Sequence, residues 1–265
     1  MPDTADLSAH LASLGRMLLG FSGGIDSTFL AVVAAQAVPP GHFLAVMGVS
    51  PSLGAVQHAH ARQIAAEHGI PLREIGTDEL EHPDYRANRL DRCYFCKQTL
   101  WRHLDAIREA EGWQVIIDGT NADDLGEHRP GLQAGREAAI RSPLAELGWR
   151  KSEIREASRE LGIESWDAPA APCLASRLTP HLTVTADRLA QVGQAEAFLR
   201  SLGVAGDLRV RHLGFSARIE VVPDQFDLLD ANWSAITARL EALGFLDTVR
   251  DPRGYRRGAL TTSGS

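Results

Sequence analysis

The first half of the chain alternates short apolar runs with longer segments of mixed apolar and polar residues. Strand-like runs lie at 17–21, 43–49, 72–75 and 115–118, and helical patterns lie between them at 25–37, 53–68 and 94–111. This alternation is typical of βαβ units, in which helices cover both faces of a parallel sheet. We therefore predict an α/β fold whose parallel sheet is flanked by helices.

A proline-containing stretch at residues 166–180 separates this half from the rest of the chain. Its prolines predict irregular structure and a domain junction. Beyond it, the apolar pattern predicts a helix, two strands, a helix and a strand, over 186–202, 208–212, 217–222, 226–243 and 245–249. We expect a large domain over 1–165, a junction over 166–184, a small α+β domain over 185–255 and a flexible tail over 256–265.

The first strand-like run leads directly into a segment, Ser22–Ser27, that we call the glycine loop. Gly23 and Gly24 allow a tight turn and let a ligand approach the backbone closely. The helix that follows presents free N–H groups and the positive end of its dipole, which together favour phosphate. No lysine follows the glycines, so the loop differs from the G-x-x-x-x-G-K-[ST] motif.

Two further strand ends supply polar groups at the same edge of the predicted sheet, where ligands bind in folds of this class. Gly119, Thr120 and Asn121 follow the fourth strand, and Val49 and Ser50 end the second. We expect the first three to contact a nucleotide and the last two to lie near its adenine. A helix cap followed by first-turn acids is the alternative explanation for the segment after the fourth strand.

Two carboxylates belong to this predicted site. Asp26 lies in the glycine loop, and Asp124 follows the fourth strand. Mg²⁺ prefers carboxylate and phosphate oxygens, so either residue is a candidate to hold Mg²⁺ against the phosphates of the nucleotide. Mg²⁺ is therefore an expected cofactor.

Composition narrows the class of protein. The 265-residue chain has a net charge of −7, which argues against a general affinity for nucleic acid. No apolar run approaches a membrane span, and Asp3 and Asp6 stand where a signal peptide would be basic. We expect a cytoplasmic protein without nucleic-acid or membrane partners, whose three cysteines stay reduced.

The cysteines are the remaining candidates for chemistry. Cys93 and Cys96 form a C-x-x-C pair, which fits a redox pair, part of a metal or iron–sulfur site, or two buried thiols. Cys173 lies among prolines and close to Arg177, and a cationic, partly exposed setting favours a nucleophilic thiolate. Three thiolates also suffice to hold an iron–sulfur cluster with one iron left open.

Four segments together resemble the LarE family, in the same order and over nearly the whole chain: the glycine loop, Arg92–Lys97, Gly119–Asp124 with Arg129–Gly131, and Pro172–Arg177. LarE proteins are ATP-dependent sulfur transferases of the ATP pyrophosphatase, or PP-loop, superfamily. The resemblance implies that ATP adenylates a carboxylate of pyridinium-3,5-biscarboxylic acid mononucleotide and that sulfur then displaces AMP. The product is a thiocarboxylate, on the route to the nickel-pincer nucleotide cofactor of lactate racemase.

The resemblance also implies roles for single residues and for assembly. Arg129 would contact the nucleotide, and the small domain would join copies of the chain into a homo-oligomer. In one branch of the family, the cysteine matching Cys173 gives up its own sulfur and becomes dehydroalanine. In the other branch, three cysteines hold a [4Fe–4S] cluster that delivers sulfide. Because Cys93, Cys96 and Cys173 match all three, we favour the cluster route.

The substrate is anionic and requires fixed positive charge. Arg209 and Arg211 stand two apart on a predicted strand, so their side chains share one face. Guanidinium groups suit phosphate, and the resemblance implies that this pair holds the substrate phosphate. Ser176 and Arg177 flank Cys173 and would contact the acyl-adenylate, and Glu196 is the candidate acid or base for sulfur release. A solvated strand face is the alternative for the arginine pair.

Three other functions fit the glycine loop. A tRNA thiolase is disfavoured by the acidic net charge and the lack of a basic run. An amide-forming enzyme similar to NAD synthetase would leave Cys173 idle. A protein that binds ATP without chemistry would release no pyrophosphate.

Overall fold

The computed structural model describes residues 2–126, 130–164 and 172–256, which form two compact units. The described residues of unit 1 are 2–50, 55–82, 91–126 and 130–164, and those of unit 2 are 51–54, 83–90 and 172–256. Two short segments of the first half thus belong to unit 2. The boundary expected at residue 165 does not anticipate them.

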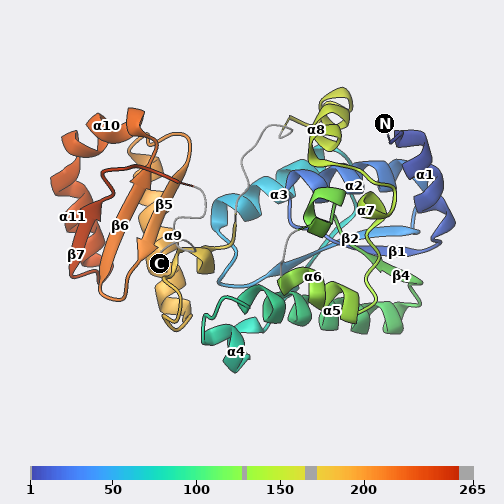
Figure 1. The fold of residues 1–265 in the computed structure, drawn as a ribbon, viewed down its shortest axis with the longest axis horizontal. Helices are drawn as coiled ribbons and strands as arrows, with labels where there is room; N and C mark the ends of the chain where they lie inside the picture. Colours follow the sequence, from blue (N-terminus) through green and yellow to red (C-terminus); the bar gives the residue numbers. More distant parts are fainter. Residues whose placement is uncertain (1, 127–129, 165–171, 257–265) are drawn as a thin grey trace. The chain divides into compact units, whose positions relative to one another are not determined.

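A four-stranded parallel sheet forms the centre of unit 1 (Figure 1). Its strands run in the order β3-β2-β1-β4 and are β1 (Met17–Gly20), β2 (Phe43–Val49), β3 (Leu72–Gly76) and β4 (Val115–Ile117). Every strand lies within one residue of the apolar run that predicts it. The predicted parallel sheet is therefore confirmed.

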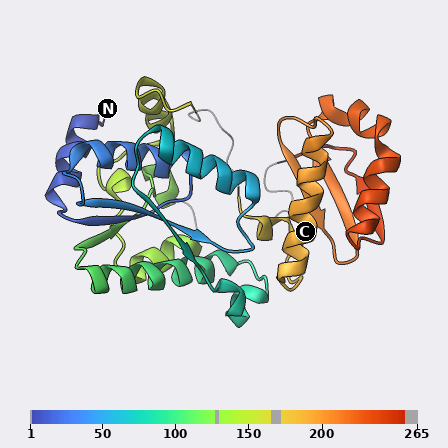
Figure 2. The same ribbon diagram turned by 180° about the vertical axis from the view of Figure 1, so that it is seen from behind.

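Helices cover both faces of this sheet, as Figures 1 and 2 show. One face carries α1 (Thr4–Ser13), α2 (Ile25–Ala37), α3 (Ala55–Glu67) and α8 (Lys151–Glu160), and the other carries α5 (Arg92–Glu111) and α6 (Pro130–Glu137). Shorter helical turns of unit 1 are η1 (Glu79–Glu81), η2 (Ala122–Gly126) and α7 (Pro143–Glu146). In the described part of the chain, no helix combines the length and apolarity needed to cross a bilayer.

The helix α2 is the most enclosed element of unit 1. Eight consecutive residues, 27–34, are buried, because α2 lies between the sheet on one side and α1 and α8 on the other. On the opposite face, Leu18, Val46, Trp101 and Leu104 form a buried core between the sheet and α5. Burial of each such side chain stabilises the fold by about 1.5–3 kcal/mol. Packing on both faces therefore fixes the position of the sheet and of the loops at its edge.

Unit 2 contains a three-stranded mixed sheet. Its strand β6 (Ser216–Val221) pairs antiparallel with β5 (Leu208–His212) and parallel with β7 (Asp247–Arg250). The helices α9 (Ala186–Ser201), α10 (Phe226–Ala231) and α11 (Trp233–Ala242) pack with it around one apolar core. The predicted small α+β fold is confirmed, with shorter turns at α4 (Pro83–Arg86), η4 (Leu174–Arg177) and η5 (Pro223–Gln225).

The single helix predicted over residues 226–243 is wrong, because α10 and α11 are separated at Asn232. Asn232 has φ −111° and ψ 10°, and its side-chain Nδ2 donates to the carbonyl oxygen of Leu228 at 2.8 Å. An asparagine side chain that bonds the backbone in this way competes with the helical hydrogen bond.

The two segments that unit 2 takes from the first half are held by backbone hydrogen bonds. The carbonyl oxygen of Ser52 accepts from Leu174 N at 2.8 Å, and that of Arg86 accepts from Val184 N at 2.9 Å. The segment after residue 171 therefore folds against residues far earlier in the chain.

A buried histidine belongs to the core of unit 2. The ring of His212 lies 5.0 Å from that of Phe245, centroid to centroid. Its Nε2 is hydrogen-bonded to Gln191 Oε1 at 3.0 Å, and its Nδ1 accepts from Gly214 N at 3.2 Å. Burial, aided by the positive charge of Arg188, lowers the pKa of His212 from 6.5 to about 4.

We expect unit 2 to lose stability as the pH falls from 6.5 towards 4. In this window the unfolded chain binds a proton at residue 212 and the folded chain does not, so acid favours unfolding, by about 1–3 kcal/mol. Urea unfolding at a series of pH values measures the effect. The variant His212→Gln should lack this part of the slope, and equal slopes in both proteins would contradict the prediction.

Candidate functional site

The strand order opens a crevice at one place in unit 1. From β1 the chain runs to β2 on one side, and it later returns to β4 on the other side of β1. The loops that leave β1 and β4 therefore diverge at the carboxyl edge of the sheet, and ligands bind at such a switch point. The glycine loop follows β1, and the segment 118–124 follows β4.

A cavity of about 410 Å³ lies at this switch point. Its lining includes Ser22, Gly24, Asp26 and Ser27 of the glycine loop, Asp118, Gly119, Thr120 and Asp124 after β4, and Cys93 and Lys97 of α5. The structure thus brings the two strand-end segments together with the start of α5. Lys97 is one lining residue that the sequence analysis did not single out.

The glycine loop turns as its sequence predicts. Gly23 has φ +71°, and a Cβ there would lie 2.5 Å from the Cβ of Ala61. The hydroxyl of Ser27 donates to the carbonyl oxygen of Gly24 at 3.0 Å. Gly24 is the N-cap of α2 and has no side chain with which to cap it. The first N–H groups of α2 therefore suit an anion in the cavity.

Gly119 joins the two walls of the cavity. A Cβ at this position would lie 2.8 Å from the backbone nitrogen of Ser27 and 3.1 Å from the carbonyl carbon of Asp26. The backbone after β4 therefore packs directly on the first turn of α2. Only glycine permits that approach without displacing the helix.

Hydrogen bonds order the segment after β4. Asp118 accepts from Thr120 N at 3.1 Å, from Thr120 Oγ1 at 2.8 Å and from Ser142 Oγ at 2.8 Å. Asn121 Oδ1 accepts from Asp123 N at 3.0 Å and so caps η2. The capping alternative is thus realised at Asn121, while Gly119 and Thr120 line the cavity.

Asp26 and Asp124 form an acidic pair at the cavity. One carboxylate oxygen of Asp26 lies 3.6 Å from the Nζ atom of Lys151, and its Oδ1 is buried without a hydrogen-bond partner among the described residues. Burial raises the pKa of Asp26 above its usual value; Lys151 opposes this shift and Asp124 adds to it. Lys151 is another contact that the sequence analysis missed, because α8 lies far along the chain.

Other predicted nucleotide residues lie apart from this lining. The hydroxyl of Ser50 donates to the buried carboxylate of Glu79, and the carbonyl oxygen of Val49 accepts from Thr77 N at 3.2 Å. Both residues are at the carboxyl end of β2, so their role near adenine stays a prediction. Arg129 lies outside the described residues.

Cys93 and Cys96 belong to unit 1, and Cys173 belongs to unit 2. Cys93 is exposed in the first turn of α5, Cys96 is partly buried one turn later, and Cys173 immediately precedes η4 in unit 2. Within the part of the chain that the structure describes, no group of three or more His, Cys, Asp or Glu side chains is arranged to hold a metal ion. The iron–sulfur site therefore stays a prediction.

Arg177 holds the backbone on which Cys173 lies. Its guanidinium is buried, and Nη1 donates to the carbonyl oxygens of Pro172 at 2.5 Å and Cys173 at 3.2 Å. Its Nε is paired with Glu196 Oε1 at 2.9 Å. Glu196 Oε1 also accepts from Val210 N at 3.0 Å, and Oε2 accepts from Arg177 Nη2 at 3.2 Å. The ion pair thus joins α9, β5 and the Cys173 segment.

The predicted arginine pair of β5 is buried. Arg209 and Arg211 are 7% and 6% exposed, so the solvated-face alternative is wrong. Arg211 Nε is paired with Glu220 Oε2 at 2.9 Å, and its Nη1 donates to the carbonyl oxygen of Ser176 at 3.0 Å. Burial lowers the pKa of Arg209, and the nearby charge of Arg177 lowers it further. Their contact with a substrate phosphate stays a prediction.

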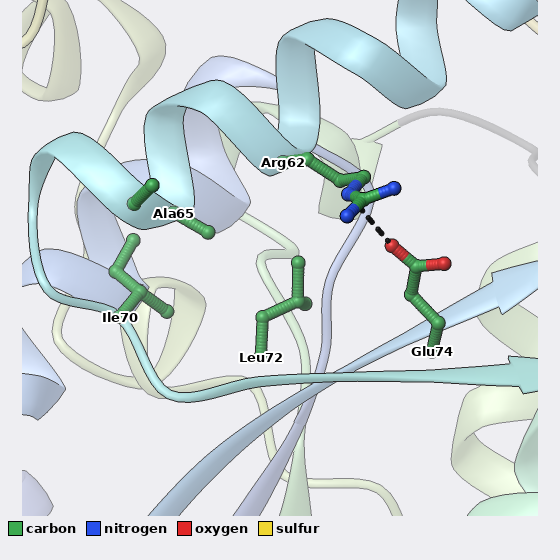
Figure 3. Close-up of a pocket in the computed structure, with 6 residues that line it drawn as sticks. Arg62, Ala65, Ile70, Leu72 and Glu74 are labelled. Carbon is green, nitrogen blue, oxygen red and sulfur yellow. Dashed lines mark ion pairs between the residues drawn. The ribbon is translucent and has the colours of Figure 1, made fainter.

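A second hollow in unit 1 lies between α3 and β3 (Figure 3). Arg62 and Glu74 form an ion pair at 3.3 Å there, and Ile70 and Leu72 also line the hollow. Leu72 begins β3, so this hollow extends away from the carboxyl edge of the sheet. It lacks the loop and helix start that favour an anion at the first cavity.

Comparison with known proteins gives similarity over the whole chain. The family model for NAD synthase matches residues 8–83, which include the glycine loop. An uncharacterized protein of Synechocystis is 40% identical over 257 residues, covering 96% of this chain and 95% of the relative. The pyridinium-3,5-bisthiocarboxylic acid mononucleotide synthase of Lactiplantibacillus plantarum is 33% identical over 257 residues, covering 97% of this chain and 92% of the relative. An uncharacterized protein of Methanocaldococcus jannaschii is 31% identical, covering 91% of each.

We expect Gly119→Ala to destabilise unit 1 and to weaken ATP binding. The new methyl group must displace the first turn of α2, and overpacking of this kind costs about 1–3 kcal/mol. Urea unfolding and calorimetric titration with ATP measure the two effects. The matched control is Gly76→Ala, at the end of β3, where a Cβ meets nothing within 4 Å. Equal behaviour of the two variants would contradict the close contact.

Arg177→Ala should destabilise unit 2. The Glu196 side chain is only 16% exposed, and the variant removes the cation with which it is paired. The expected cost is about 2–4 kcal/mol. The control is Arg62→Ala, which breaks an ion pair whose arginine side chain is 65% exposed and should cost under about 1 kcal/mol. The urea midpoints of the two variants test the contrast, and a small effect at Arg177 would refute it.

Proposed function

The chain belongs to the LarE family of PP-loop enzymes, and we propose that it uses ATP to convert a carboxylate of pyridinium-3,5-biscarboxylic acid mononucleotide into a thiocarboxylate. The strongest support is the similarity, over 97% of the chain, to a relative named as the synthase of the corresponding bisthiocarboxylic acid.

The activation half of the reaction is assigned to the cavity in unit 1. The glycine loop and the start of α2 are suited to the pyrophosphate portion of ATP. The substrate carboxylate attacks the α-phosphorus, the bond to the bridging oxygen breaks, and pyrophosphate leaves with the electron pair. The acyl-adenylate that remains is open to attack at its carbonyl carbon.

Mg²⁺ fits the acidic pair of this cavity. The buried Oδ1 of Asp26 has no hydrogen-bond partner among the described residues, and Asp124 raises the pKa of Asp26, so a divalent cation would relieve both costs. Mg²⁺ is usually held by one or two carboxylates together with substrate phosphates. Asp26 and Asp124 would therefore hold it, and the cation would neutralise charge on the leaving pyrophosphate.

The sulfur half is assigned to Cys173. In the sacrificial route its thiolate attacks the acyl-adenylate carbon, the bond to AMP breaks, and a thioester forms. A base then removes the Cα proton of residue 173, the Cβ–S bond breaks, and the thiocarboxylate leaves with dehydroalanine behind. Glu196 is the proposed base, and it would first have to release a hydrogen bond from Arg177.

The [4Fe–4S] route assigns Cys93, Cys96 and Cys173 as ligands of a cluster that supplies sulfide when bound. It is supported by the cysteine count and spacing alone. In both routes Cys173 is the residue on which sulfur delivery depends.

Cys173→Ser should separate the two halves of the reaction. We expect substrate-dependent release of pyrophosphate to persist, because the cavity in unit 1 is untouched, and thiocarboxylate formation to fall by about 100-fold or more, because an alcohol is a far weaker nucleophile. Pyrophosphate release is measured by a malachite-green assay after treatment with pyrophosphatase. Thiocarboxylate formation is measured by mass spectrometry of the product.

Intact-protein mass and iron content then distinguish the routes. Loss of the mass of one H₂S from the wild-type chain after one turnover supports the sacrificial cysteine. Repeated turnover with added sulfide, lost in Cys93→Ser, supports the cluster. A Cys173→Ser variant with full thiocarboxylate formation overturns both routes. An activated substrate that gives an amide with ammonia, and no thiocarboxylate in either protein, favours an amide-forming enzyme.

A further inference from the structure

The chain is almost without lysine. Of its 27 basic residues, only Lys97 and Lys151 are lysines, and the rest are arginines. Lysine is ordinarily among the commonest residues of a globular protein. Arginine supplies the other 25 basic side chains, so the two lysines call for a local explanation.

Each lysine is connected to the cavity of unit 1. Lys97 lines it from α5, and the ammonium of Lys151 lies 3.6 Å from a carboxylate oxygen of Asp26, which also lines it. The helices α5 and α8 cover opposite faces of the sheet (Figure 1). One cation thus lies in the cavity wall and the other contacts a wall residue from the opposite face of the sheet.

Lys97 brings a positive charge to the wall of the cavity. Among the described residues no carboxylate is paired with it, and its Nζ lies 4.7 Å from the ring centroid of Trp101. Trp101 is buried, 2% exposed, and a Cβ on the cavity residue Gly20 would lie 2.6 Å from its ring. The indole therefore positions the ammonium and leaves its charge available to an anion.

Lys151 offers a direct comparison with arginine at the adjacent position. Its backbone N–H donates to Asp123 at 2.9 Å, and its side chain turns to Asp26. The neighbouring Arg150 leaves 71% of its side chain exposed, with Nη1 4.0 Å from Asp123. At these consecutive positions the arginine side chain is mostly exposed, whereas the lysine side chain is 40% exposed and is paired with Asp26. A compact ammonium fits beside the Asp26 carboxylate, whose Oδ1 is buried, and it carries three rotatable donors where a guanidinium has a rigid fork.

We infer that Lys97 and Lys151 are the two protein cations that bind the phosphates of the nucleotide, and that arginine cannot replace either. The inference rests on the proposed function for the identity of the ligand as ATP. Lys151 holds Asp26 in place and donates to the phosphates at the glycine loop. Lys97 donates from the α5 wall, where its positive charge offsets that of the anion. Lysine binds phosphate as a point charge, so neither contact needs a planar fork.

Because the chain has only two lysines, one amine-labelling experiment measures the reactivity of both side chains. The protein with an added exposed reference lysine, Arg159→Lys on α8, is treated with a succinimidyl acetate reagent and mapped by peptide mass spectrometry. We expect saturating ATP with Mg²⁺ to slow acetylation of Lys97 and Lys151 by about tenfold and to leave residue 159 unchanged. Adenosine, which has no phosphate, should protect neither lysine.

Calorimetric titration of the same sample separates this inference from the proposed function. If ATP binds and either lysine keeps its full reactivity, the assignment of that lysine is wrong and the proposed function stands. If ATP does not bind, both fail. In a second measurement, Lys97→Arg and Lys151→Arg should each weaken ATP binding by about tenfold despite their retained charge, and the reference Arg159→Lys should not. Unchanged affinity in the arginine variants would overturn the claim that lysine is required.

Discussion

The contact between Gly119 and the first turn of α2 is the constraint on which the rest of unit 1 depends. It places the backbone after β4 against Ser27 with no side chain between them. Because α2 is enclosed by the sheet, α1 and α8, the helix has no room to move away from this contact. The helix start, the glycine loop and the ordered segment after β4 therefore keep one fixed spacing. An anion site built from backbone N–H groups requires such a spacing, since backbone groups have no rotamers with which to adapt.

Unit 2 positions its cysteine segment by a different means. Buried ion pairs join Arg177 to Glu196 and Arg211 to Glu220, and both arginines also donate to carbonyl oxygens between residues 172 and 176. Buried pairs add little net stability, because desolvation of the two charges offsets their attraction, but breaking one is costly. Their effect is to favour one conformation of the irregular segment around Cys173. Unit 1 thus fixes its site with glycine and close packing, and unit 2 fixes its segment with charge.

The sequence predicts elements whose signal is local and repeated. The four parallel strands and the glycine loop follow from apolar runs and glycines that stand next to one another. The break at Asn232 was missed, because it depends on one side-chain hydrogen bond inside an otherwise helical pattern. The burial of Arg209 and Arg211 was not anticipated either, since alternating charge on a strand normally faces solvent. Lys151 pairs with Asp26, which is 125 positions earlier in the sequence, and no local sequence pattern indicates a contact between residues so far apart.

The way in which unit 2 takes segments from the first half bears on the order in which the chain folds during synthesis. Residues 51–54 and 83–90 leave the ribosome with unit 1, yet their backbone partners Leu174 and Val184 are made much later. Domains generally fold as units as they emerge, and unit 1 must do so with two loops that have no partners yet. A fragment that begins at residue 172 would lack both segments. The two units are therefore not separable by one cut: a fragment that ends at residue 171 contains all of unit 1, but it keeps two segments of unit 2 without their partners.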